Sequence, residues 1–247
     1  MPINEQTVLV TRPAPQAKQL CEQLTAEGFL PICYPTIATQ AVDEPTQATT
    51  TLQACHNSDY LIFVSANAVL QANLLLNSQW PKNDASVVAI GPKTAEALRK
   101  IDLPATITAD KPFSSEQLLE KFPDELSTKK GLIIKGEGGR TLLAEQLQQR
   151  GMSVSTVDVY KRVLPRNHDS RHLEVPHYIT ITSQLALDNL FILARLTANE
   201  LKQHSTFVVF SQRIAHHAKK LGCQHIIICK EASDFGLISA ITHAEKR

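Results

Sequence analysis

Small hydroxyl residues, glycines and basic residues follow the short apolar runs of this 247-residue chain. Backbone N–H groups at helix starts bind anions, and residues of these types leave such groups accessible. The candidate anion-binding residues are Thr11, Arg12, Ser65, Ala66, Gly91, Lys93, Thr94, Lys135, Gly136, Thr182, Ser183 and Ser211. Serine and threonine at these places also suit plain helix capping, which is the competing interpretation. Because six segments of this kind should converge, we expect a site for an anionic ligand.

A tyrosine could move a proton at such a site, because a phenol keeps its proton at neutral pH and can donate it. The chain has four tyrosines, Tyr34, Tyr60, Tyr160 and Tyr178. Tyr60 and Tyr178 begin predicted strands, away from the expected ligand edge. Tyr160 lies at a crossing between predicted domains and is better placed to face a ligand. Packing in a half-buried environment is the more common role of a tyrosine and is the alternative.

The remaining motifs argue against a nucleotide and against a metal. Residues 136–140 read Gly-Glu-Gly-Gly-Arg, which matches neither the G-x-G-x-x-G fingerprint nor the Walker loop. Cys223, His225 and Cys229 lack a zinc spacing and alternate along a predicted strand, so we expect no metal site. No Ser/His/Asp order and no carboxylate pair indicates another catalytic apparatus.

The elements that must position these residues repeat within the chain. Residues 60–65 match 178–183, and residues 87–95 match 207–215, at a nearly constant spacing. A unit of strand, helix, glycine and strand at 8–34 matches another at 132–160. Gly28 and Gly151 are the predicted helix stops of the two copies.

Alternating strands and helices, with strands that are apolar throughout, predict α/β domains with parallel sheets. The second half of the chain lacks the strand–helix–strand unit, which occurs at the amino terminus instead. We therefore expect residues 1–35 plus 166–247 to form one discontinuous domain, into which residues 36–165 are inserted. The crossings at 31–38 and 156–166 should pair as a two-stranded connector, with a cleft between the two similar domains.

Composition is typical of a globular protein. Hydrophobic residues make up 43% of the chain, and the formal net charge of +1 gives no general attraction to nucleic acid or to an anionic membrane. No secretory signal begins the sequence, and no apolar run approaches the roughly 18 residues of a membrane-spanning helix. The five cysteines form no Cys-x-x-Cys pair and indicate reduced thiols, so we expect a cytoplasmic protein.

A set of sequence blocks runs in order over nearly the whole chain. The blocks are residues 8–13 (Val-Leu-Val-Thr-Arg-Pro), 63–69 (Phe-Val-Ser-Ala-Asn-Ala-Val), 89–95 (Ala-Ile-Gly-Pro-Lys-Thr-Ala), 135–140 and 157–160 (Val-Asp-Val-Tyr), with the strand ends at Thr182-Ser183 and Ser211. Together these blocks resemble the bacterial uroporphyrinogen-III synthase family. The resemblance implies two α/β domains, the first of them discontinuous, in agreement with the repeat.

The resemblance also implies a cofactor-free lyase of tetrapyrrole and haem biosynthesis. Its substrate would be hydroxymethylbilane, a linear tetrapyrrole with eight carboxylates. The enzyme would close this chain to uroporphyrinogen III, with inversion of ring D and release of water. Tyr160 matches the family's tyrosine, which is thought to assist the departure of hydroxide, and the anion-binding residues named above would bind the carboxylates. We further expect a monomer that makes a transient contact with hydroxymethylbilane synthase and binds no nucleic acid.

Two alternatives come from other classes of protein. A non-catalytic two-domain protein that binds a small anion would also pair α/β domains, as solute receptors do. The lack of a signal peptide and of a DNA-binding segment argues against an exported receptor and a repressor. A nucleotide-dependent Rossmann enzyme is disfavoured because its glycine fingerprint is missing.

Overall fold

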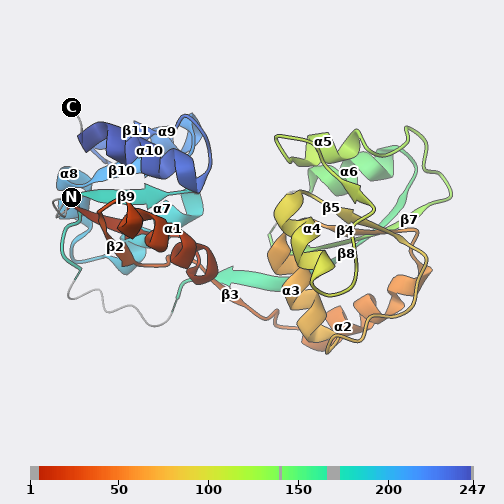
Figure 1. Ribbon diagram of the computed structural model, residues 1–247. Helices are drawn as coiled ribbons and strands as arrows, with labels where there is room; N and C mark the ends of the chain where they lie inside the picture. The colour runs from red at the N-terminus through yellow and green to blue at the C-terminus, as the bar shows by residue number, and fades with distance from the viewer. Residues whose placement is uncertain (1–5, 139–140, 166–172, 246–247) are drawn as a thin grey trace. The chain divides into compact units, whose positions relative to one another are not determined.

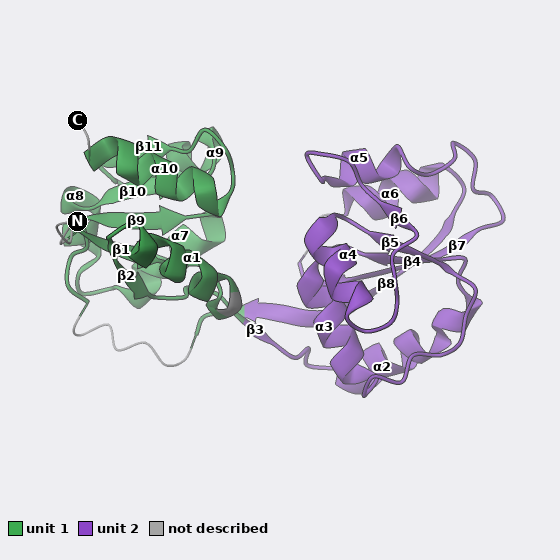
Figure 2. Ribbon diagram, in the orientation of Figure 1, with its two compact units in different colours: residues 1–38, 163–247 green, residues 39–162 purple. Residues whose placement is uncertain are grey.

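The structure, a computed structural model, describes residues 6–138, 141–165 and 173–245 (Figure 1). The chain divides into two compact units (Figure 2). Unit 1 comprises residues 1–38 and 163–247, and unit 2 comprises residues 39–162. No helix among the described residues is both long enough and apolar enough to cross a membrane.

Unit 1 contains a five-stranded parallel sheet in the order β11-β10-β9-β1-β2. Its strands are β1 (Thr7–Val10), β2 (Leu30–Cys33), β9 (Tyr178–Ile181), β10 (Thr206–Val209) and β11 (His225–Ile228). Its helices are α1 (Ala14–Ala26), α7 (Gln184–Leu193), α8 (Ala198–His204), α9 (Gln212–Lys220) and α10 (Asp234–Glu245). Most of these strands are short and are followed by a helix along the chain, as in other α/β folds.

Unit 2 contains a six-stranded sheet in the order β3-β8-β7-β4-β5-β6, parallel from β8 to β6. Its strands are β3 (Ala38–Gln40), β4 (Tyr60–Phe63), β5 (Ser86–Ala89), β6 (Ile107–Thr108), β7 (Lys130–Gly136) and β8 (Ser153–Val163). Its helices are α2 (Pro45–Gln53), the 3₁₀ turn η1 (Ala54–Asn57), α3 (Ala66–Leu75), α4 (Pro92–Arg99), α5 (Ser115–Leu119) and α6 (Leu142–Gln149).

The two sheets confirm the internal repeat. The order β6-β5-β4-β7-β8 in unit 2 corresponds strand by strand to β11-β10-β9-β1-β2 in unit 1. The added strand, β3, is the hydrogen-bonded neighbour of β8, as expected for a two-stranded connector at the two places where the chain changes unit. The amino-terminal unit β1–α1–β2 therefore supplies the strands that β7–α6–β8 supply in unit 2.

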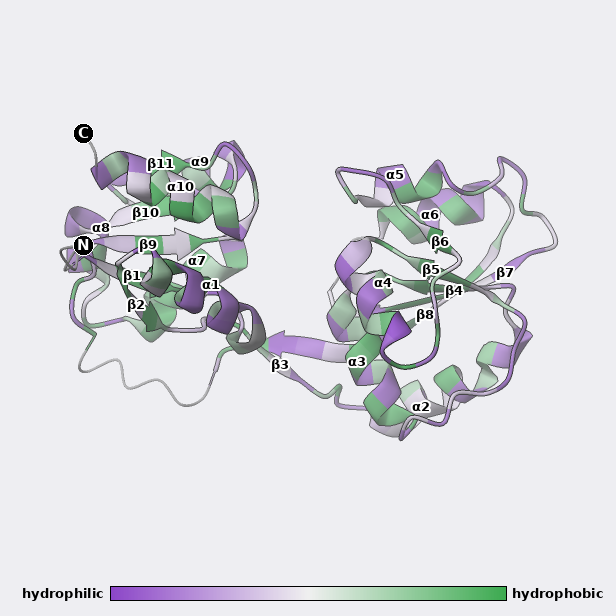
Figure 3. Ribbon diagram, in the orientation of Figure 1, coloured by the Kyte–Doolittle hydropathy of each residue, from purple (hydrophilic) through white to green (hydrophobic). Residues whose placement is uncertain are grey.

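Alternate residues of the central strands belong to cores on opposite faces of the sheet. In β4, Leu61 and Phe63 pack with residues of α2, α3 and α4, whereas Ile62 packs with residues of α5 and α6. In β1, Leu9 packs with residues of α7 to α9, and its two neighbours pack with α1 and α10. Strands buried on both faces are mostly apolar, so β4 and β5 are largely green in Figure 3, whereas β3 is purple.

Glycines end two corresponding helices in the same way. Gly28 (φ +88°) and Gly151 (φ +90°) lie in the left-handed region, where glycine has no Cβ penalty. After each of them, the next N–H turns back to the helix: Phe29 N donates to Leu24 O, and Met152 N donates to Leu147 O. Both predicted helix stops are confirmed.

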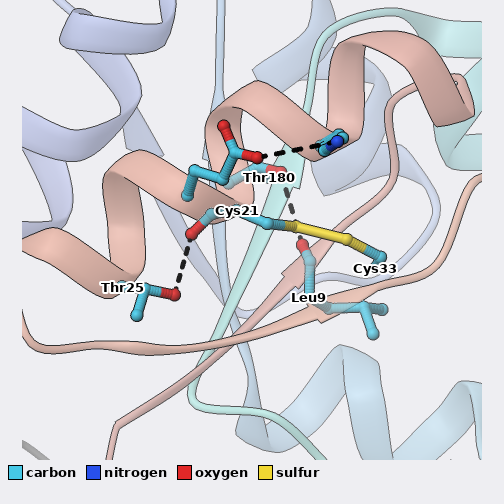
Figure 4. The surroundings of a disulfide bond; sticks show 7 residues. Leu9, Cys21, Thr25, Cys33 and Thr180 are labelled. Atoms are coloured by element: carbon cyan, nitrogen blue, oxygen red, sulfur yellow. Dashed lines mark hydrogen bonds and ion pairs between the residues drawn. A yellow bond between two sulfur atoms is a disulfide. The ribbon is translucent and has the colours of Figure 1, made fainter.

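The cysteine prediction needs a correction. Cys21, on α1, and Cys33, at the end of β2, form a disulfide in the structure (Figure 4). The other three cysteines, Cys55, Cys223 and Cys229, are buried free thiols. Cysteine spacing along the chain gave no indication of this pair, because α1 packs against β2 only in the folded unit.

We expect the native protein to show no fast-reacting thiol near pH 7 in a titration with a disulfide reagent. Burial raises the pKa of Cys223 and Cys229 to about 11 and also raises the pKa of Cys55, so little thiolate forms. Mild reduction should release two thiols, of which the exposed Cys33 reacts first. In the control Cys33→Ser, one thiol should be free without reduction. Two fast thiols in the untreated native protein would contradict the disulfide.

Candidate functional site

Three neighbouring strands of unit 2 bring the site residues together. β4 lies beside β7, β7 lies beside β8, and all three run parallel, so their carboxyl ends meet at one edge of the sheet. Ser65 follows β4, Gly136 ends β7, and Tyr160 lies in β8. Ligands of open parallel sheets bind at this edge.

A bulge in β8 sets the direction of Tyr160. Lys135 is paired with Asp158, but the next residue, Gly136, is paired with Tyr160, so Val159 is an extra residue in β8. Val159 and Tyr160 are consecutive and yet both are buried, with exposed fractions of 0% and 1%. A bulge changes the direction of side chains and is common beside functional sites.

Gly136 leaves the space that the Tyr160 ring occupies. A Cβ atom built on Gly136 would lie 2.4 Å from Tyr160 Cζ and 2.6 Å from Cε2. No side chain fits there, so the close approach itself requires glycine at this position. Glu137 N also donates to Tyr160 O at 2.8 Å, which ties the end of β7 to the same residue.

The Tyr160 hydroxyl has two polar neighbours from different elements. Its Oη lies 3.2 Å from Ser65 Oγ and accepts a hydrogen bond from Arg162 Nη2 at 3.1 Å. The Arg162 guanidinium also stacks over the phenol ring, with its Cζ 5.5 Å from the ring centroid. Ser65 Oγ in turn accepts a hydrogen bond from Ala68 N at 3.0 Å, as the N-cap of α3.

These residues line a cavity of about 320 Å³ that lies within unit 2. Its walls combine apolar residues with hydroxyl and basic residues. The principal lining residues are Ser65, Phe113, Ser114, Ser115, Lys135, Gly136, Leu143, Tyr160 and Arg162. A concave site with a few converging polar groups is the usual form of a small-molecule binding site.

The other predicted residues of unit 2 have different environments. Lys135 Nζ forms an ion pair with Asp158 Oδ1 at 2.6 Å, which neutralises much of its charge. Lys93 is exposed in the first turn of α4, whereas Thr94 is only 3% exposed. Gly91 is buried against Phe113, whose Cβ would lie 3.2 Å from an added Cβ.

The predicted serines of unit 1 are helix caps. Ser183 Oγ accepts from Ala186 N, and Ser211 Oγ accepts from Ile214 N. The capping interpretation is therefore confirmed for both serines, as it is for Ser65. A cap of this kind satisfies the third N–H of the helix and leaves the first two facing outward, where an anion could still bind.

Two predicted residues of unit 1 have partners inside the protein. Thr11 is fully buried, and its Oγ1 donates to Thr180 O at 2.6 Å. Arg12 forms an ion pair with Asp234 and donates to Gln16 Oε1 at 2.9 Å, and its side chain is only 11% exposed. These side chains hold β1 and α10 in place and are not open to a ligand in this structure.

Sequence reasoning missed nine of the thirteen lining residues of the cavity: five are aliphatic, and the other four are Phe113, Ser114, Ser115 and Arg162. Arg162 could have been found, because it lies two residues after Tyr160 in a strand, and such residues share a face. The other three lie on the segment between β6 and α5 or at the start of α5, which carries no motif. Residues 139 and 140 of the glycine-rich motif lie outside the described residues. Among the described residues, no three His, Cys, Asp or Glu side chains are grouped as metal ligands.

Comparisons with known proteins agree with one another. Residues 18–239 match the family model described as uroporphyrinogen-III synthase HemD. The chain is 27% identical to the uroporphyrinogen-III synthase of Escherichia coli K12, with 95% of this chain and 99% of that one covered, and 32% identical to the Proteus mirabilis enzyme, with 64% and 80% covered. A crystal structure of a mutant uroporphyrinogen III synthase from the extremely thermophilic bacterium Thermus thermophilus has the same fold, with a TM-score of 0.62, 17% identity and coverage of 98% of this chain and 99% of that chain.

Replacing Gly136 by alanine tests the contact with the Tyr160 ring. The new methyl group would overlap the ring, so we expect the free energy of unfolding to fall by about 1–3 kcal/mol and the near-ultraviolet tyrosine signal to change. A Tyr160→Leu background is the matched control, because the three atoms nearest to the added Cβ all belong to the Tyr160 ring, so the same substitution should cost less stability there. An equal loss of stability in both backgrounds would show that the ring does not need the space.

Proposed function

The chain belongs to the uroporphyrinogen-III synthase family, and we propose that the Tyr160 cavity of unit 2 is where its substrate reacts. Membership makes the chain a cyclising lyase of tetrapyrrole biosynthesis, which converts hydroxymethylbilane to uroporphyrinogen III and water. The alternative of a non-catalytic anion-binding protein has no support among the relatives.

The reaction needs the loss of an oxygen and control of geometry. The C–O bond of the hydroxymethyl group breaks while the pyrrole nitrogen supplies an electron pair, which leaves an electrophilic methylene carbon. The substituted carbon of ring D attacks this methylene carbon and forms a spiro intermediate. The bond from the same ring D carbon to its former bridge then breaks, and reclosure at the other free position inverts ring D. Because the free bilane closes without inversion, holding one reactive conformer is a large part of catalysis.

We assign to Tyr160 the proton that the departing oxygen takes up. The observation that carries this assignment is a buried phenol ring whose hydroxyl reaches a cavity wall beside Ser65. A proton donated at this place turns a poor leaving group, hydroxide, into water. The proton released from the pyrrole at ring closure returns the phenolate to phenol, so the enzyme is unchanged after each cycle.

The carboxylates of the substrate would be bound largely by backbone N–H groups. In unit 2 the proposed binding residues are Ser65, Ala66, Gly91, Lys93, Thr94, Lys135 and Gly136, and in unit 1 they are Thr182, Ser183 and Ser211. Helix N-termini stabilise negative charge through aligned peptide dipoles, so this binding needs no excess of basic residues. Thr11 and Arg12 would act indirectly, since their side chains are engaged within unit 1.

We propose a monomer and a cytoplasmic location. We also propose a transient contact with hydroxymethylbilane synthase, because the bilane closes spontaneously and a short transfer would limit that loss.

Isomer analysis tests the activity. We expect fresh hydroxymethylbilane, generated in the same tube by its synthase, to give mainly the type III porphyrin after incubation with this protein and oxidation. The control without the protein should give the type I isomer. A folded protein that yields only type I would refute the activity.

The variant Tyr160→Phe tests the proton donor. We expect turnover to fall by about 10²- to 10⁴-fold, the usual contribution of general acid catalysis, with the free energy of unfolding little changed. Tyr60→Phe is the matched control, because Tyr60 lies at the opposite end of β4 with its ring against Phe122. Wild-type turnover in Tyr160→Phe would remove Tyr160 from the mechanism.

A further inference from the structure

We propose that Arg162 is a positioning residue for this reaction: it holds the phenol oxygen of Tyr160 as a hydrogen-bond acceptor, so that the phenol proton is available to the substrate. The inference rests on the proposed role of Tyr160 and names a residue that acts through it.

Tyr160, Arg162 and Ser65 differ in the hydrogen bonds that they can donate and accept. An arginine can only donate, so the Arg162 Nη2–Tyr160 Oη contact at 3.1 Å uses the phenol oxygen as acceptor. The contact between Ser65 Oγ and Tyr160 Oη, at 3.2 Å, permits either donor. Ser65 Oγ already accepts from Ala68 N, so its own proton is free to be donated to Tyr160. In that arrangement the phenol oxygen accepts twice, and the proton of Tyr160 can point to the substrate.

Arg162 also places a positive charge beside the phenol oxygen of Tyr160. Two other basic side chains close to this part of β8 are neutralised, since Lys135 pairs with Asp158 and Lys161 pairs with Asp43. Within residues 6–138, 141–165 and 173–245, no carboxylate forms an ion pair with Arg162. Its positive charge therefore acts on the phenol oxygen, which becomes negative when the proton leaves. Fixed charges aimed at developing negative charge are a main source of catalysis.

The geometry of β8 places Arg162 beside the Tyr160 ring. Tyr160 and Arg162 are two residues apart in β8, so they share one face of the strand. The guanidinium lies over the phenol ring, 5.5 Å from its centroid, and this stacking restrains the planar group while one N–H reaches the hydroxyl. Lysine keeps the charge but lacks the plane and the fork of donors, so it can replace arginine only in part.

A double-mutant cycle tests the inference, with the initial rate of type III formation as the readout. We expect Arg162→Ala to lower kcat by about 10²- to 10³-fold, the scale of a lost donor to a developing oxyanion, while KM changes little. In the Tyr160→Phe background, where the phenol oxygen is absent, the same substitution should have almost no further effect on kcat. Arg162→Lys should recover part of the loss, and Arg162→Gln should recover less.

Lys161→Ala is the matched control, because it removes the adjacent basic residue of the same strand, whose partner is Asp43. It should keep the wild-type kcat. Circular dichroism and urea unfolding of each variant identify any loss of fold, and Arg162→Lys and Arg162→Gln serve for the cycle if the alanine variant does not fold.

The outcomes separate the inference from the proposed function. A full effect of the Arg162 substitution in the Tyr160→Phe background, or a rise in KM at unchanged kcat, would overturn the inference and make Arg162 a carboxylate-binding residue instead. If the wild-type protein forms only type I, the proposed function fails and the inference fails with it. Type III formation together with a non-additive cycle supports both.

Discussion

The close approach of one aromatic ring to one glycine governs the site. The bulge at Val159 directs Tyr160 toward β7, and the ring then occupies the space that any side chain at position 136 would fill. Packing of this density leaves the ring a single position, so the hydroxyl is fixed relative to Ser65 and Arg162 without a dedicated loop. A side chain held in this way loses little entropy when a ligand arrives.

The edges of the sheets suggest how a polyanion can be bound by a protein of almost neutral charge. Three serines cap the N-termini of their helices in the same conformation: Ser65, Ser183 and Ser211. Each has an extended backbone, and its side-chain oxygen accepts a hydrogen bond from the backbone N–H three residues later. Each cap leaves the outer N–H groups of its helix facing outward. Partial charges of the backbone are fixed by the fold, whereas lysines would have to be ordered. The same arrangement stabilises the helices and would also serve the proposed binding of carboxylates.

Much of the fold could be predicted from sequence, because most strands are short, apolar and followed by a recognisable helix start. The repeat even predicted which strands of the two sheets correspond. Side-chain environments could not be predicted in the same way. Thr11 and Arg12 match the family blocks, yet they contact Thr180 and Asp234, which lie far along the chain. The Cys21–Cys33 pair and the cavity wall at Phe113 likewise arise from packing between elements, which leaves no periodic trace in the sequence.

The chain order of the strands has a consequence for synthesis on the ribosome. β1 lies between β2 and β9 in the sheet, and β9 begins only at Tyr178. The first strand to leave the ribosome can therefore pair with β9 only after the whole of unit 2 has been synthesised. Unit 2 has all its strands by Val163 and can complete its sheet earlier. Cotranslational folding should then proceed from the inserted unit outward, while the apolar β1–α1–β2 segment remains an unfinished sheet edge that is open to chaperones until the last third of the chain appears.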